Sequence, residues 1–216
     1  MRAASKNNKE SAAKFREFLS FNKSCFGFID PGINFCGYAL YECELREDDQ
    51  AVVTRLKRSG CITHASKGKT DLDRTLAIAE GVMLHLSSKK LRKVYIEEPP
   101  PTIYNQRGMN KSSLVARAQS IFRTVGVAYA VAQSFASSKF PVEMLYPTSW
   151  QPGKSTYAGL TVKEWSLNNA NGILRMNNFD SVLKTHKDIN EADAINQGHF
   201  LLSEIQNEDG KVSWKL

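Results

Sequence analysis

Short apolar runs separated by turn residues predict strands in the first third of the chain. Residues 25–30 (CFGFID) form an apolar run that ends in a carboxylate, and the pair Pro31-Gly32 after it marks a turn. Residues 36–42 (CGYALYE) predict the returning strand of a hairpin, and residues 51–57 (AVVTRLK) predict a third strand.

Helical spacing begins at about residue 71. Apolar residues three or four apart predict the buried face of a helix, made of Leu72, Leu76, Ala79, Met83 and Leu86. The same spacing predicts a longer helix with Leu114, Ala118, Ile121, Val125, Ala128, Ala132 and Phe135 on its inner face. Between these helices, residues 93–97 (KVYIE) predict a strand that ends before three consecutive prolines, because proline has no amide hydrogen to donate.

Residues 141–147 (PVEMLYP) predict a fifth strand, and helices are predicted near 163–175 and over 188–202. The last helix has an inner face of Ala192, Ile195, His199 and Leu202. Strands that alternate with helices indicate parallel crossovers. The order of elements predicts an α/β protein with the RNase H-like fold, a five-stranded mixed sheet flanked by helices.

The length and composition fit one globular domain with a hydrophobic core. The chain has 216 residues, of which 42% are hydrophobic and 24% are charged, close to the values of globular proteins. We expect one RNase H-like domain over 25–216, preceded by a basic arm or helix over 1–24. No run reaches the roughly 18–20 apolar residues needed to cross a bilayer, so an integral membrane protein is not expected.

The charge favours a polyanionic partner. Lys and Arg number 29 against 22 Asp and Glu, which leaves a net charge of +7, and residues 1–24 hold four of these positive charges. Nucleic acid and an anionic membrane surface both fit this excess. The first 24 residues fit a solvated tail as well as a DNA-contacting arm, and also a mitochondrial transit peptide, although Glu10 and Glu17 count against the last.

The cysteines and the N-terminus predict a reducing, intracellular location. Cys25, Cys36, Cys43 and Cys61 show neither a C-x-x-C pair nor paired histidines, so we expect small core residues rather than disulfides or zinc ligands. An apolar signal-peptide segment is not seen at the start. Cytoplasm, nucleoid and mitochondrion all remain open.

Three acidic residues fall where this order of elements brings chain ends together. Asp30 ends the first strand, Glu97 ends the fourth, and Asp193 lies near the start of the last helix. Clustered carboxylates raise one another's pKa, and a hard divalent cation relieves the repulsion. Two such ions about 3.5–4 Å apart catalyse phosphodiester hydrolysis in many nucleases. Taken alone, Asp30 fits a plain turn, Glu97 a solvated strand end and Asp193 a helix cap better than a catalytic site, so the prediction rests on their joint occurrence.

Four segments carry a resemblance to a known family. IDPGINFCGYAL resembles the first-strand motif of RuvC-like Holliday junction resolvases, and VYIEEPPPT resembles their fourth strand, which selects Glu97 over Glu98. EMLYPTSWQPGK followed by GLTVKE resembles the segment that places a lysine at Lys163, and HKDINEADAINQG resembles the terminal motif. The resemblance covers roughly residues 25–205. It implies a Mg²⁺-dependent endonuclease, with Mn²⁺ as a substitute, that acts as a homodimer on branched DNA and uses Asp30, Glu97, Asp193 and Lys163.

The chain departs from the family motif at Asn190, where the family has Asp or His three residues before the final Asp. Asn190 can ligate a metal only through its neutral amide oxygen, which lowers the charge at a second metal. Three explanations stay open: Asp188 or Glu191 substitutes, Asn190 suffices, or the chain is an inactivated Asp-to-Asn variant. His186 fits a base or ligand less well than a surface residue before a helix.

Two loops, 99–113 and 147–163, mix cations, aromatic residues and glycine beside the predicted site. In a nuclease such loops contact phosphates and stack on opened bases. The predicted DNA-binding residues are Arg107, Lys111, Lys154, Lys163, Tyr104 and Trp150. A core role for Tyr104, Trp150 and Tyr157 is the alternative.

The sequence therefore predicts a Holliday junction endonuclease. Two alternatives are a flap or RNA-processing nuclease on the same fold, and a DNA-binding protein with a degenerate site.

Overall fold

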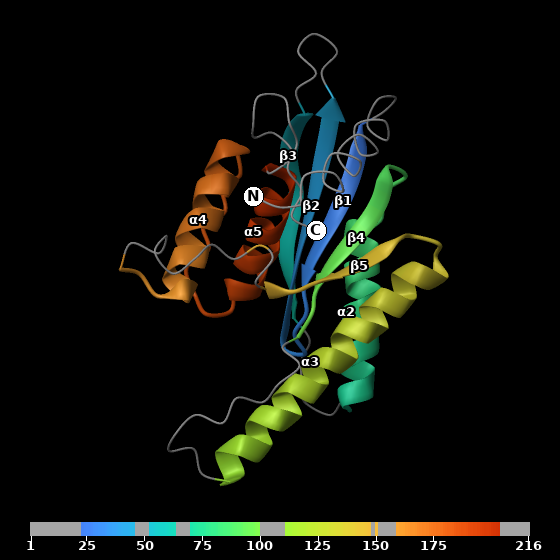
Figure 1. Ribbon diagram of the computed structural model, residues 1–216, viewed down its shortest axis with the longest axis vertical. Coiled ribbons are helices and arrows are strands. Elements are labelled where there is room, and N and C mark those ends of the chain that lie inside the picture. The colour runs from blue at the N-terminus through green and yellow to red at the C-terminus, as the bar shows by residue number, and fades with distance from the viewer. Residues whose placement is uncertain are drawn as a thin grey trace, which may run out of the picture.

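The computed structural model describes residues 23–45, 52–63, 70–99, 111–147, 150 and 159–203. A five-stranded sheet with the order β3-β2-β1-β4-β5 forms its centre (Figure 1). The strands are β1 (Ser24–Asp30), β2 (Phe35–Leu45), β3 (Val52–Thr63), β4 (Leu91–Glu97) and β5 (Val142–Leu145). β1, β2 and β3 are antiparallel neighbours, whereas β4 runs parallel to β1 and β5 parallel to β4. The predicted mixed α/β sheet is confirmed.

Helices cover both faces of the sheet. The helices α2 (Asp71–Leu86) and α3 (Lys111–Ser137) pack on one face, and α4 (Val162–Met176) and α5 (Ile189–Ser203) pack on the other (Figure 1). The starts of α2 and α4 are each closed by a reciprocal capping box, Thr70 with Asp73 and Thr161 with Glu164. Within the described ranges, no helix combines the length and apolarity required to cross a membrane.

The central strands are buried on both faces, which divides the core in two. On β1, Phe28 packs towards α4 and α5, stacked on Tyr95 with ring centroids 5.1 Å apart. The next residue, Ile29, points to the opposite face and joins the core beneath α2 and α3, together with Ile96 of β4. This alternation follows from the two-residue period of a strand.

The predicted inner face of α2 is wrong in its first half. Leu72 and Leu76 are 66% and 52% exposed, and the buried residues are Arg74, Ile78, Ala79, Val82 and Leu86. The helix carries apolar residues on two sides, so spacing alone did not reveal which side meets the sheet.

The long helix α3 packs on the sheet only through its second half. Its fully buried residues are Val127, Ala128, Val131 and Phe135, and its first turns extend away from the sheet (Figure 1). The four cysteines are free thiols in the core or at its margin, as expected.

Candidate active site

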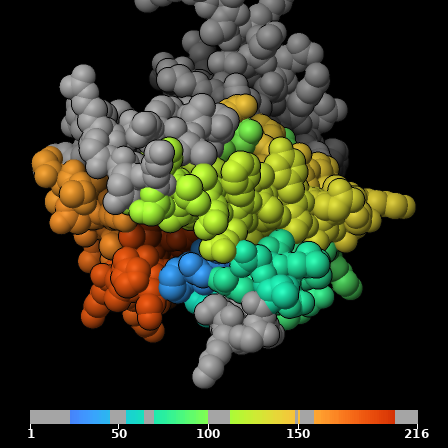
Figure 2. All heavy atoms as spheres, turned by 90° about the horizontal axis from the view of Figure 1, so that it is seen from below, coloured from blue at the N-terminus to red at the C-terminus, as the bar shows by residue number. Residues whose placement is uncertain are grey.

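The sheet places Asp30 and Glu97 side by side. β1 and β4 are parallel neighbours in which Ile29 lies opposite Ile96, so the next residue of each strand is its terminal carboxylate. Adjacent strands are about 4.8 Å apart. Atoms of the first described part of the chain, in blue, come to the surface between α5, in red, and α2, in green (Figure 2).

Helix α5 brings the third carboxylate to the same edge. Gly37 of β2 is the cross-strand partner of Asp30, and a Cβ at Gly37 would lie 1.9 Å from the backbone oxygen of Asn190. Only glycine therefore lets the first turn of α5 rest on the sheet at this point. Asp193, three residues further along α5, then lies near both strand ends.

The pKa shifts show that the three carboxylates interact. Burial, Glu97 and Asp193 together hold the pKa of Asp30 well above its usual range. Burial, and then the charge of Asp193, raises the pKa of Glu97 to about 7. Burial raises the pKa of Asp193 to about 6, although Ser166 and Lys163 act in the opposite direction. The cluster therefore concentrates acidic groups in a poorly solvated place, and the nearby cation and hydrogen-bond donors compensate this only in part.

One oxygen of Glu97 is occupied by two hydrogen-bond donors. The Trp150 indole Nε1 donates to Glu97 Oε2 at 3.1 Å, and Gln197 Nε2 donates to the same oxygen at 2.8 Å. Gln197 is fully buried, and its own Oε1 has no hydrogen-bond partner among the described residues. These two donors hold Oε2 of the Glu97 carboxylate in place.

The placement of Trp150 corrects its predicted role in DNA stacking. The residue is 3% exposed and belongs to the core beneath α4 and α5, so its ring offers no free face to a base. The alternative, a core role, is the one that the structure supports.

Asp193 is held by a buried polar network from α4. Ser166 Oγ donates a short hydrogen bond to Asp193 Oδ1. Asn196 Nδ2 in turn donates to Ser166 Oγ at 2.8 Å, and Asn169 Nδ2 donates to Asn196 Oδ1 at 2.8 Å. The sequence interpretation missed Ser166, Asn196 and Gln197. Helical spacing places Asn196 and Gln197 on the side of α5 that carries Asp193, three and four residues after it, but it does not reveal their contacts with α4 and β4. Nothing in the local sequence indicated Ser166, which lies on α4.

Comparison with solved structures identifies the fold. The chain is similar to Thermus thermophilus RuvC at 18% identity and a TM-score of 0.53, over 84% of this chain and 97% of that one. It matches T. thermophilus RuvC in complex with a Holliday junction substrate at 16% identity and the same TM-score, over 83% and 95% of the two chains. The chain has the RuvC fold. No family model matches the sequence, and no curated protein matches it either.

On this RuvC fold, Lys163 lies near enough to Asp193 for its charge to affect that carboxylate. It is exposed in the first turn of α4, and its charge lowers the pKa of Asp193. The charge of Lys163 thus reaches Asp193, and its contact with phosphate stays a prediction.

The Asn190 position lies beside the turn that follows Asp30. Its side-chain nitrogen would be 3.0 Å from a Cβ placed on Gly32. Of the possible substitutes, Glu191 accepts a hydrogen bond from Ser59 on β3 at 2.7 Å, and burial is the main cause that raises its pKa. Its carboxylate is thus engaged with β3.

Asp188 organises the turn before α5. Its Oδ2 accepts hydrogen bonds from the backbone nitrogens of Lys184 and Thr185 at 2.9 and 2.8 Å. Although burial opposes the shift, these bonds lower the pKa of Asp188. His186 is exposed, with its ring 6.4 Å from that of Phe35. Metal ligation by Asn190, Asp188 or Glu191 stays a prediction.

Half of the predicted DNA-binding residues lie outside the described residues, namely Tyr104, Arg107 and Lys154. The same holds for Tyr157 and for the basic segment 1–22. Lys111 is the first residue of α3, and its role stays a prediction.

The donor set fits a hard divalent cation. Asp30, Glu97 and Asp193 offer carboxylate oxygens, the ligands that Mg²⁺ prefers. Burial is the main cause of their raised pKa values, and neighbouring carboxylates raise the pKa of Asp30 and Glu97 further. In the part of the chain that is described, no three acidic, histidine or cysteine side chains converge tightly enough to hold an ion as they stand. The residues fit in chemistry and placement, and ligation requires the carboxylates to approach further.

Proposed function

We propose that the protein is a metal-dependent, structure-specific endonuclease that cuts four-way DNA junctions by phosphodiester hydrolysis. The observation that carries this proposal is the convergence of Asp30, Glu97 and Asp193, each with a raised pKa, at the strand ends of a RuvC fold. Mg²⁺ is the proposed ion, with Mn²⁺ as a substitute.

The three carboxylates would hold the ion, with Asn190 as a further neutral ligand. When bound, Mg²⁺ supplies a Lewis acid that favours ionisation of a nucleophilic water and stabilises charge on the departing oxygen. The chain prepares the ligands in advance: Trp150 and Gln197 orient Glu97, and Ser166 orients Asp193. Lys163, beside Asp193, would stabilise negative charge on the phosphate.

A two-fold dimer is the proposed assembly, because symmetric cutting of a junction requires two sites at a fixed angle. The face formed by α2 and α3 supports this arrangement. It exposes large apolar side chains that a partner would cover, namely Leu72, Leu76, Val115, Phe122 and Tyr129.

The decisive experiment compares substrates of equal length. A four-way junction, a flap, a linear duplex and an RNA–DNA hybrid are incubated with the protein and Mg²⁺, Ca²⁺ or EDTA. We expect paired, symmetric cuts in the junction with Mg²⁺, binding with little turnover in Ca²⁺, and no cutting in EDTA. Preferential cutting of the flap or hybrid would assign the protein to the alternative nucleases, and binding without cutting would indicate a degenerate site.

The same assay tests the carboxylates. Asp30→Asn, Glu97→Gln and Asp193→Asn should each abolish cutting and keep junction binding, because each removes charge with little change of shape. A loss of both binding and folding would make these residues structural.

Asn190→Asp tests the departure from the family motif. We expect faster cutting with unchanged junction affinity, since a carboxylate would complete the ligand set. An unchanged rate would shift attention to Asp188→Asn and Glu191→Gln.

A further inference from the structure

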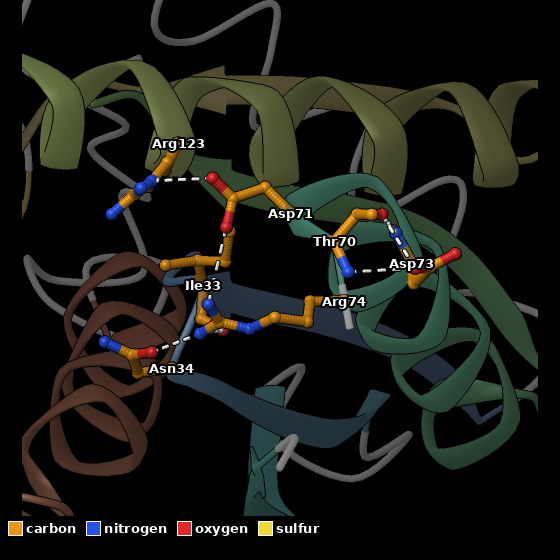
Figure 3. Close-up of polar contacts among 7 residues, drawn as sticks. All are labelled: Ile33, Asn34, Thr70, Asp71, Asp73, Arg74 and Arg123. Atoms are coloured by element: carbon orange, nitrogen blue, oxygen red, sulfur yellow. Dashed lines mark hydrogen bonds and ion pairs between the residues drawn. The ribbon is translucent and has the colours of Figure 1, made fainter. Parts of the chain in front are cut away.

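The connection between β1 and β2 is held by a buried arginine from another element. Residues 31–34 directly follow Asp30, and Arg74 of α2 reaches them from below the sheet edge. Arg74 Nη2 donates to the backbone oxygen of Ile33 at 3.1 Å and makes a short hydrogen bond to Asn34 Oδ1 (Figure 3). The segment that carries Asp30 is thereby tied to α2.

Burying the charged Arg74 side chain at this position costs folding free energy. It is 7% exposed on the inner face of α2, where the other buried residues are apolar. Its Nε has no hydrogen-bond partner among the described residues. A partly satisfied buried cation is weak support for stability, and an apolar residue of similar size often serves stability as well. The contacts of Arg74 with the connection therefore call for a role beyond core stability.

The arginine is linked in turn to α3. Arg74 Nη1 lies 3.4 Å from Asp71 Oδ1, and Arg123 Nε of α3 donates to Asp71 Oδ2 at 2.8 Å (Figure 3). The series Arg123–Asp71–Arg74, which we call the arginine relay, thus runs from α3 across the start of α2 to the connection after Asp30.

The relay also borders an apolar hollow. Ile33, Leu72, Leu76 and Phe122 line this hollow of about 450 Å³ together with the relay residues Asp71 and Arg123. The hollow is therefore lined both by apolar residues of the proposed dimer face and by the Asp71–Arg123 ion pair of the relay.

We propose that Arg74 is a positioning residue that sets the location of Asp30, and that Asp71 and Arg123 make this location depend on the placement of α3. This proposal rests on the proposed function, because the position of Asp30 affects cutting only if the carboxylate cluster is the active site. Arg74 acts through the backbone of Ile33 and the side chain of Asn34, and it does not touch the carboxylates in the contacts described.

The first test replaces Arg74 with Met and with Lys. Hydrogen exchange followed by mass spectrometry, without DNA or metal, should show faster exchange in the peptide containing residues 31–36 of Arg74→Met, and little change in a peptide from α4. Mn²⁺ binding, measured by calorimetry, should weaken. The cutting rate should fall by about tenfold or more, as expected for losing hydrogen bonds to a charged group, with junction affinity within about twofold. Arg74→Lys should recover part of the Mn²⁺ affinity.

The second test uses the exposed half of the relay, where substitution leaves the core intact. Arg123→Gln and Asp71→Asn should each slow cutting by about two- to fivefold, the range for a half-exposed ion pair. The double variant should be no slower than the slower single one, because both break the same link. Arg117→Gln, with the same charge change on the same helix, is the matched control and should cut at the normal rate.

The outcomes separate this proposal from the proposed function. Unchanged exchange of residues 31–36 and unchanged Mn²⁺ affinity in folded Arg74→Met would overturn the positioning role, even if the protein cuts junctions. Additive effects of Arg123→Gln and Asp71→Asn would overturn the link to α3. If the wild-type protein cuts no DNA, the exchange measurement still decides whether Arg74 holds the connection.

Discussion

At the scale of single residues, hydrogen-bond donors hold two carboxylates of the cluster, Glu97 and Asp193, whereas burial and like charge raise the pKa of Asp30. One oxygen of Glu97 accepts hydrogen bonds from Trp150 and Gln197. Burial and the charge of Asp193 still raise the pKa of Glu97 to about 7. Hydrogen bonds to a carboxylate lower its pKa, so desolvation and repulsion outweigh them here. A bound cation, as proposed above, would stabilise the ionised form of these carboxylates.

These shifts make the stability of the metal-free protein depend on pH. A carboxyl group with a raised folded pKa keeps its proton in the folded protein over a range in which the unfolded chain has lost it. Its contribution is fully present below the unfolded pKa and is lost as pH rises through the folded value. In EDTA, we expect the free energy of unfolding to be lower near pH 8 than near pH 5, by on the order of a few kcal/mol. Thermal unfolding, followed by circular dichroism, should therefore occur at a lower temperature near pH 8.

Glu97→Gln and Mg²⁺ provide the controls for this pH effect. The variant lacks the titrating group, and the cation favours the ionised form, so either should flatten the slope between about pH 5 and pH 8. A slope that persists unchanged in Glu97→Gln, Asp193→Asn and Asp30→Asn would show that other groups cause it.

At the scale of elements, the site depends on how closely α5 approaches β2. Gly37 is the contact point, and the backbone of Asn190 occupies the space where a side chain would be. The same helix supplies Asp193 and Gln197, so a shift of α5 moves two residues of the site together.

Gly37→Ala should therefore destabilise the protein and impair the site. Because the added Cβ would lie 1.9 Å from Asn190 O, α5 must move, and we expect a loss of about 3 kcal/mol in unfolding free energy. Urea unfolding measures this loss. Gly172→Ala in α4, where a Cβ meets nothing within 4 Å, is the control and should be neutral or gain up to about 1 kcal/mol. Equal stability of both variants would contradict the close contact.

At the scale of the whole molecule, the two helical layers differ in what they present to solvent. The layer of α4 and α5 supplies Asp193, Lys163 and the polar network, whereas the layer of α2 and α3 exposes apolar side chains and carries the arginine relay. One layer thus contributes Asp193 and Lys163 to the candidate site, and the other carries the surface that we propose for a second copy.

Phe122→Glu should prevent dimer formation. The side chain is 70% exposed on α3, so the charge leaves the monomer fold intact and is desolvated only at an interface. Sedimentation should show a monomer, and paired cuts should become single nicks. Met176→Glu, at a 69% exposed position on α4, should keep the dimer. Identical sedimentation of wild type and both variants would place the interface elsewhere.

The sequence by itself determined the order of the elements and the positions of Asp30, Glu97 and Asp193 at their ends. These follow from local chemistry: apolar runs stop at carboxylates and prolines, and helical spacing extends over neighbouring residues. The fold class followed from that order.

Only the tertiary structure decided which groups hold those carboxylates. Trp150 and Gln197 lie 53 and 100 residues from Glu97 along the chain, and the choice of Ile78 over Leu76 as the buried side of α2 depends on the sheet beneath it. The contact of Arg74 with Ile33 spans 41 residues. Such contacts arise when distant elements pack together, and no local spacing in the chain encodes their geometry.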